Sequence, residues 1–169
     1  MPMTPFMARF PEVGARETRS VTVPPQQDLP AGEYGFVELY CDEPGCDCRR
    51  VIIDVLRPET GWSKVWATIS YGWESLDFYR KWSGSGSDAT EAKGPYLDPL
   101  NPQTLYSPSL LNLFRFLVQS PDYVARLRRH YLMFRESIDS ELGHNQQTDP
   151  LENKRARVHN RKRRPRHRH

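Results

Sequence analysis

The sequence predicts an α+β fold, in which a small antiparallel β-sheet of three to four strands packs against two C-terminal helices and is stabilised by a metal knuckle. Three observations favour this class: aromatic and β-branched runs separated by short turns, two later segments with helix start signals, and three clustered cysteines. A chain of 169 residues suffices for about one domain. We expect a flexible lead at 1–18, a zinc-stabilised α+β domain at 19–142 and a disordered basic tail at 143–169.

The first half of the chain predicts the strands. Residues 1–18 contain several prolines, so we expect an extended and weakly ordered lead. A short strand at 19–23 and a turn-rich connector at 24–32 follow. Three further stretches combine aromatic and β-branched residues and are expected to be strands, at 33–40, 49–55 and 64–71. Their short connectors favour an antiparallel meander.

Residues 62–103 join the sheet to the helices. Seven aromatic residues lie at 62–82, and we expect them to belong to the core rather than to a platform for stacked nucleobases. Residues 75–82 predict one or two helical turns. Residues 83–103 are rich in Gly, Ser and Pro and predict a loop whose length makes it either mobile or functional.

Two helices are expected at the end of the domain, each preceded by a Ser-Pro pair that supplies an N-cap and a proline for the first turn. The pair that begins at Ser107 predicts a helix at 109–119. The pair that begins at Ser120 predicts a helix at 123–140, and Gly143 is expected to end it.

Charge is distributed unevenly along the chain. The net charge is +3, with 24 Lys and Arg against 21 Asp and Glu. Residues 151–169 hold nine of these bases and a single acid, which leaves 15 bases and 20 acids in residues 1–150. The body is therefore near −5 and the tail near +8. This distribution argues against a basic nucleic-acid-binding globule and assigns any affinity for polyanions to the tail.

The basic tail is a candidate site for non-specific contact with nucleic acid, RNA or DNA, or with another polyanion. Its cations would release counterions from phosphates, so this binding should be sensitive to salt and independent of sequence. The alternative is a solvated end that aids solubility. The candidate residues are Lys154, Arg155, Arg157, Arg161, Lys162, Arg163, Arg164, Arg166 and Arg168.

All three cysteines lie within eight residues, as Cys41, Cys46 and Cys48 in a C-x4-C-x-C arrangement between two predicted strands. A knuckle of this kind brings three sulfurs together, which suits a tetrahedral ion about 2.3 Å from each sulfur. Soft thiolates select zinc, Cu(I) or iron–sulfur clusters, and zinc is the common choice in structural sites. We predict a structural Zn²⁺ site, with core-filling thiols or redox-active thiols as the alternatives.

A closed structural site needs a fourth ligand, and His130 is the best placed of the five histidines. Apolar residues three and four positions away put it on a helix face that should pack on the sheet. Strand alternation puts Cys41 on the face of Val37, so that a core-facing Cys41 and a core-facing His130 could meet. The alternative is that Asp42, Asp47 or water completes the site.

Two arginines follow the last cysteine directly. Arg49 and Arg50 are expected to neutralise a site of three thiolates on Zn²⁺, or to donate hydrogen bonds to sulfur. Cys46 and Cys48 alternate out of phase with the apolar residues of the next strand, so a bulge or kink near Arg49 is required.

These features favour an accessory or binding protein over an enzyme. Three thiolates weaken the Lewis acidity of zinc, and the chain has neither the H-x-E nor the C-x-x-C pattern of nucleobase deaminases. One alternative is a thiol-based redox protein or metalloenzyme that uses Cys41, Cys46 and Cys48. A second alternative is a protein-interaction adaptor whose 83–103 loop and acidic body face a partner.

The sequence also predicts a cellular compartment. The N-terminus has no apolar run of the length that a secretory signal requires, and no stretch approaches the roughly 20 apolar residues that span a bilayer. An odd number of cysteines speaks against a disulfide framework. We therefore expect a cytoplasmic protein with reduced thiols and no membrane contact.

The stretch at 29–55, LPAGEYGFVELYCDEPGCDCRRVIIDV, resembles a segment of small uncharacterised bacterial proteins that carry a cysteine knuckle after a G-E-Y-G-F strand. These proteins also have a later His-Tyr helix segment, to which Arg129-His130-Tyr131 is similar, and residues 66–82 fit the same likeness. Some of them append a cysteine-rich SEC-C metal-binding motif, whereas this chain has no cysteine after Cys48. The resemblance implies metal binding with His130 and implies no particular activity.

Overall fold

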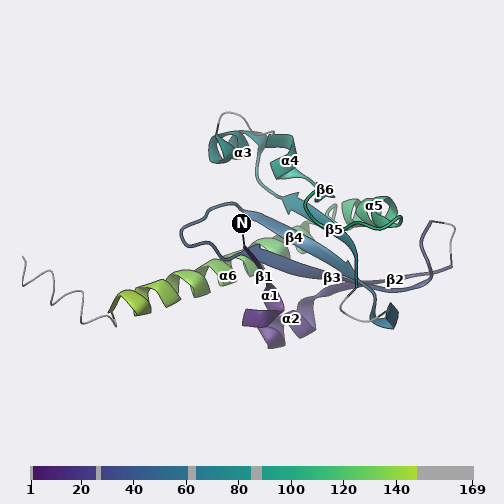
Figure 1. Ribbon diagram of the computed structural model, residues 1–169, viewed down its shortest axis with the longest axis horizontal. Coiled ribbons are helices and arrows are strands. Elements are labelled where there is room, and N and C mark those ends of the chain that lie inside the picture. The colour runs from purple at the N-terminus through teal and green to yellow at the C-terminus, as the bar shows by residue number, and fades with distance from the viewer. Residues whose placement is uncertain (1, 26–27, 61–63, 85–88, 148–169) are drawn as a thin grey trace, which may run out of the picture.

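The computed structural model describes residues 2–25, 28–60, 64–84 and 89–147. In this part of the chain an antiparallel sheet packs against helices, which confirms the α+β class (Figure 1). The sheet has six strands, more than the three to four expected: β1 (Met3–Pro5), β2 (Arg19–Val23), β3 (Gly32–Cys41), β4 (Arg50–Leu56), β5 (Val65–Gly72) and β6 (Tyr96–Leu97). The helices are α1 (Phe6–Arg9), α2 (Pro11–Glu17), the 3₁₀ turn η1 (Pro58–Thr60), α3 (Leu76–Ser83), α4 (Ala89–Lys93), α5 (Ser107–Leu117) and α6 (Pro121–Gln147).

Strand β3 organises the sheet. The strand order is β1-β3-β4-β5-β6, and β2 also pairs with β3. β1 pairs with the end of β3 at Cys41, and β2 pairs with the end at Gly32, so both short strands share one edge of β3. β3, β4 and β5 form the expected antiparallel meander.

The N-terminal lead differs from the prediction, because β1, α1 and α2 occupy most of residues 1–18. Phe6 is 3% exposed and stacks on His130, with ring centroids 4.2 Å apart. Pro11 is in the first turn of α2, where a missing backbone N–H costs no hydrogen bond. Proline therefore marks a helix start in this segment, and the segment is part of the folded domain.

The second half follows the predicted helices with different ends. α5 and α6 begin at the two Ser-Pro pairs, and α6 continues past Gly143 to Gln147. The predicted loop at 83–103 contains α4 and β6 in its described part. β6 pairs two residues with β5, which is too short a strand for alternation to show in the sequence. The nine basic residues predicted to bind polyanions lie outside the described residues.

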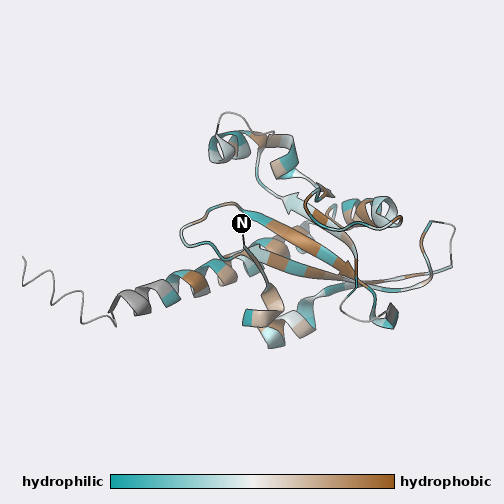
Figure 2. Cartoon of the chain, viewed as in Figure 1, coloured by the Kyte–Doolittle hydropathy of each residue, from teal (hydrophilic) through white to brown (hydrophobic). Residues whose placement is uncertain are grey.

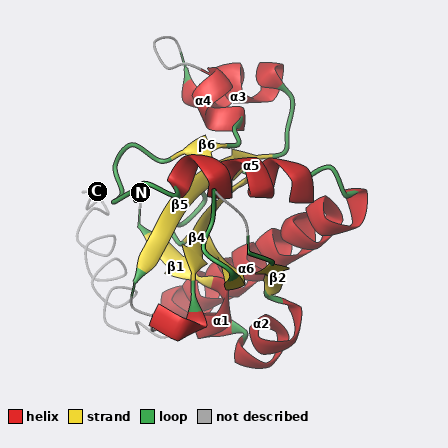
Figure 3. Cartoon of the chain, turned by 90° about the vertical axis from the view of Figure 1, so that its right-hand side faces the viewer, coloured by secondary structure: helices red, strands yellow, loops and turns green. Residues whose placement is uncertain are grey.

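The two faces of the sheet have different environments. One face packs against α5 and α6, and its buried side chains from the three central strands include Phe36, Glu38, Tyr40, Val51, Ile53, Val55, Ala67 and Ile69. In Figure 1 α6 lies behind the sheet, Figure 3 shows it to one side of the strands, and Figure 2 shows apolar residues gathered in the central strands. On the opposite face Leu39 and Ile52 remain partly exposed.

Helices α3 and α4 pack where β5 ends, at Gly72. A Cβ atom on Gly72 would meet the Tyr79 hydroxyl and would come within 2.6 Å of the Ala92 carbonyl oxygen. The same Tyr79 hydroxyl donates a hydrogen bond of 2.8 Å to the backbone carbonyl of Arg49. Glycine at position 72 therefore lets α3 contact the backbone that leads from the cysteine segment into β4.

Candidate metal centre

The structure brings the three cysteines together. Cys41 is the last residue of β3, and Cys46 and Cys48 lie in the segment before β4. Their three sulfur atoms lie within 4.8 Å of one another, and all three thiols are free. Thiols this close can hold one metal ion between them, which agrees with the predicted knuckle.

A tight turn produces this convergence. The Cys46 amide donates a hydrogen bond of 3.2 Å to the Glu43 carbonyl, and Gly45 has φ of +70°. A proline in the second position and a glycine with positive φ in the third are typical of a type II turn. Pro44 and Gly45 therefore fold the chain back so that Cys46 and Cys48 approach the end of β3.

Arg49 supplies the kink that the alternation of side chains requires. It has φ of +46°, the left-handed region that non-glycine residues seldom adopt, and β4 begins at the next residue. Its guanidinium lies 2.9 Å from Asp47 and 3.6 Å from Glu74, and it covers the Phe78 ring at 4.6 Å. These contacts hold the segment in the conformation that presents Cys48.

Burial and backbone hydrogen bonds act in opposite directions on the thiols. Burial raises the pKa of the Cys48 thiol to about 12, the neighbouring Cys46 adds to this rise, and a hydrogen bond from the Arg50 backbone opposes it. Burial also raises the pKa of Cys41, against a backbone hydrogen bond from Glu43. Amide donors of this kind stabilise thiolates, and a bound cation would supply the remaining stabilisation.

The three thiols differ in their access to solvent. A reactive cysteine is accessible and has a lowered pKa. Cys41 and Cys48 are 0% and 2% exposed, and their pKa values are raised. Only Cys46 is partly exposed. Burial of two of the three thiols limits their access to a substrate or redox partner.

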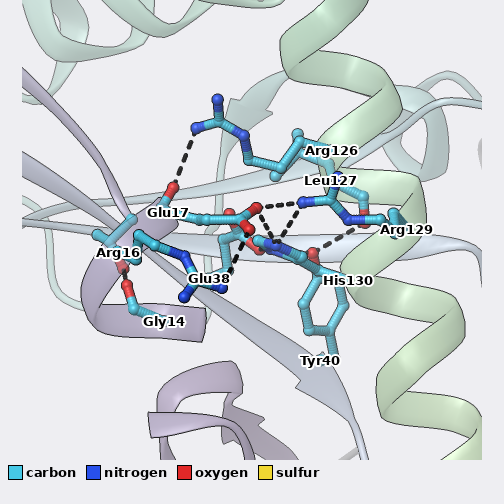
Figure 4. A network of polar contacts seen from close by, with 10 residues as sticks. Gly14, Arg16, Glu17, Glu38, Tyr40, Arg126, Leu127, Arg129 and His130 are labelled. Carbon is cyan, nitrogen blue, oxygen red and sulfur yellow. Dashed lines mark hydrogen bonds and ion pairs between the residues drawn. The ribbon is translucent and has the colours of Figure 1, made fainter. Parts of the chain in front are cut away.

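His130 is not part of this centre, contrary to the prediction that it is the fourth ligand. Among the described residues the group close enough to share an ion consists of the three cysteines. His130 is 1% exposed, with Nδ1 at 2.7 Å from Glu38 Oε2 and Nε2 at 3.1 Å from Glu17 Oε2. Figure 4 shows this network, in which both ring nitrogens have carboxylate partners.

The phase of β3 explains why His130 and Cys41 do not meet. Glu38 contacts His130, and Tyr40 lies 3.0 Å from the Leu127 carbonyl of α6, so these even-numbered residues face the helix. Side chains alternate along a strand, which places Val37 and Cys41 on the opposite face. Because both faces of β3 carry apolar residues, the sequence alone did not distinguish them.

The histidine network ties three segments together. Glu17 comes from α2, Glu38 from β3 and His130 from α6, and the Tyr40 hydroxyl lies 2.8 Å from Glu38 Oε2. Burial acts to raise the pKa of Glu17, but the hydrogen bond from His130 and the charge of Arg129 outweigh it, so that pKa is lowered. Neither glutamate was predicted from the sequence. One signal for Glu38 is present: it lies two positions before Tyr40 in a strand, and a charged residue on the same strand face as a buried tyrosine needs a polar partner.

The aspartates beside the cysteines also have other partners. Asp42 Oδ2 accepts a hydrogen bond of 2.7 Å from the Thr4 hydroxyl. Asp47 binds Arg49 and accepts a hydrogen bond of 3.3 Å from the Tyr131 hydroxyl. Neither aspartate belongs to the group of possible ligands found among the described residues. The described part of the chain therefore offers three ligands, all of them thiols.

Comparison with known proteins found no matching family model, no similar curated protein and no similar solved structure. Within the described residues, no helix combines the length and the apolar character needed to cross a membrane.

Proposed function

We propose that this protein binds one zinc ion through the thiolates of Cys41, Cys46 and Cys48, and that the ion has a structural role. The observation that carries the proposal is the approach of the three sulfurs to within 4.8 Å of one another. Zinc is the ion that structural thiolate sites most commonly hold. A reducing compartment such as the cytoplasm would keep the three thiols available for the metal.

A structural role fits the position of the centre better than a catalytic role. Three thiolates give zinc so much negative charge that it polarises a substrate weakly, and two of the three thiols are buried. The ion would join the end of β3 to the start of β4 across a turn whose residues Glu43, Pro44 and Gly45 are exposed. Water, or a group from outside the described residues, would take the fourth position.

Zinc content of the purified full-length chain tests this proposal. Protein prepared without a metal-affinity tag should contain one zinc per chain by elemental analysis, and Cys46→Ser should contain much less. Cys46 is the variant of choice because it is partly exposed, so serine is tolerated there. An exposed serine variant elsewhere, Thr22→Ser, is the matched control and should keep its zinc. Zinc-free wild-type protein that takes up no added zinc would refute the proposal.

The charge distribution supports a second function for the basic tail. We propose that residues 151–169 contact nucleic acid or another polyanion without sequence preference, because nine cations are concentrated there beside an acidic body. Deleting 151–169 should abolish binding to a labelled RNA, and the full chain should bind it less tightly as salt rises. Binding that survives the deletion, or that does not respond to salt, would contradict this assignment.

A further inference from the structure

We propose that the cavity beside the cysteine segment is a binding site for a small organic monocarboxylate, held by Arg50. The cavity has a volume of about 440 Å³, which lies within the roughly 300–1,000 Å³ typical of small-molecule sites. It is lined by Met3, Ile52 and Leu100, with Cys48 and Arg50 beside them. Cys48 belongs both to this lining and to the three-cysteine group, so the cavity adjoins the metal centre, although no part of the proposal requires the ion.

Strand geometry places the cavity on the sheet face that the long helices leave open. Met3 pairs with Cys41, and Ile52 pairs with both Leu39 and Ser70, so all of these lie on the face away from α6. The edge strand β6, with the residues that follow it, closes one side of the cavity. The position at the edge of the sheet leaves the cavity accessible from outside.

Arg50 is a positioned cation without an ion-pair partner among the described residues. Its Nη2 atom donates to the Tyr96 hydroxyl at 2.9 Å and also contacts the Ser70 hydroxyl, which fixes the guanidinium. Its Nε atom is buried and has no hydrogen-bond partner among the described residues. In that part of the chain no carboxylate lies within ion-pair distance of Arg50, although Arg49 beside it has two. A positive charge without an ion-pair partner is costly to leave unmatched, and a ligand carboxylate in the cavity would supply the missing negative charge.

The other walls restrict the ligand class. Glu91 and Asp98 also line the cavity; their charges oppose any anion, and they oppose a ligand with two negative charges more strongly than one with a single charge placed at Arg50. Asp98 is 8% exposed and accepts hydrogen bonds at Oδ1 from the Leu100 amide and from Asn101. This carboxylate therefore stabilises the loop that follows β6. The remaining walls are largely apolar. A single carboxylate attached to an apolar body satisfies both conditions.

Leu100 gives a second reason to expect an apolar ligand body. Its side chain is 91% exposed, the most exposed large apolar side chain among the described residues, and it lies at this cavity. A fully exposed leucine gains nothing from the fold, whereas a ligand bound at Arg50 would remove part of it from water.

Three probes separate charge from shape: 4-methylpentanoate, 3-methylbutylamine with the same branched body, and succinate as a dianion. Binding would be measured by saturation-transfer NMR with the full-length protein as purified, its zinc content determined alongside. We expect 4-methylpentanoate to bind, the amine not to bind, and succinate to bind more weakly.

Arg50→Gln should weaken the binding of 4-methylpentanoate about tenfold or more, as expected for loss of a charge-assisted hydrogen bond. The exposed Arg80→Gln is the matched control and should bind as wild type does.

Leu100→Ser keeps the test decisive if Arg50→Gln does not fold, because an exposed position tolerates serine. The Leu100→Ser variant should also bind 4-methylpentanoate more weakly than wild-type protein does, while its zinc content stays unchanged. Absence of 4-methylpentanoate binding to wild-type protein, equal binding of the amine, or equal binding to the folded Arg50→Gln variant would overturn the proposal. The zinc content is determined for each protein, so that failure of this site in zinc-loaded protein is distinguishable from failure of the metal proposal.

Discussion

Replacing His130 by leucine is expected to destabilise the fold by about 1–3 kcal/mol, the cost of leaving a buried polar group without its hydrogen-bond partner. The variant leaves Glu38, which is 4% exposed, beside an apolar side chain, with Oε1 already lacking a partner among the described residues. For a domain of this size the loss corresponds to a fall in Tm of roughly 5 °C. Equilibrium unfolding in urea measures it. The zinc content should stay at the wild-type level, since the ring nitrogens of His130 contact carboxylates and not the cysteines.

The double variant His130→Leu with Glu38→Leu is the control for this interpretation. It removes both members of the buried pair, and such replacements are often neutral or stabilising. We therefore expect the double variant to recover most of the stability lost in the single variant. A single variant as stable as wild type, or a double variant no better than the single one, would show that the network contributes little.

Removal of zinc is expected to lower Tm by about 10 °C. A ligand present at 1,000 times its Kd stabilises the folded state by about 4 kcal/mol, and each kcal/mol shifts Tm by roughly 2–4 °C at this size. The effect should be concentrated near the knuckle, where the turn has a single backbone hydrogen bond between Cys46 and Glu43. Hydrogen exchange should quicken in the 42–48 segment and at the start of β4, and much less in β5. Differential scanning calorimetry with and without a chelator gives the shift in Tm.

Cys48→Ser serves as the control for the chelator itself. Cys48 is buried and is one of the three thiols that lie close together, so serine at this position should prevent tight zinc binding and give the low Tm without chelator. Adding chelator to this variant should then change nothing further. A wild-type protein whose Tm is unaffected by chelation would show that the ion does not stabilise the fold.

The sequence was informative where one physical signal dominated. The strands β2, β3, β4 and β5 have aromatic and β-branched runs, and the two Ser-Pro pairs mark the starts of α5 and α6. The cysteine knuckle was also predictable, because three cysteines within eight residues need only a turn to converge. The glycine of that turn, Gly45, and the kink at Arg49 are both present.

The remaining features depend on tertiary contacts that periodicity does not encode. β3 carries buried residues on both faces, so the choice that sends Glu38 to α6 and Cys41 to the other side is made by packing. The N-terminal helices are only four and seven residues long, and the stacking of Phe6 on His130 ties them to the domain. The cavity at Arg50 brings β1, β4 and the residues after β6 together from distant parts of the chain.

The most direct test of the metal centre is to count its thiolate ligands by replacing zinc with cobalt(II). The intensity of the sulfur-to-cobalt charge-transfer band grows with the number of coordinated thiolates, so model complexes of known composition calibrate the count. In wild-type protein we expect the charge-transfer band to have the intensity of complexes with three thiolates. The His130→Leu variant should give the same spectrum, and the Cys48→Ser variant should lose the band. A spectrum for fewer than three thiolates, or one that changes when His130 is replaced, would contradict a centre built from Cys41, Cys46 and Cys48 alone.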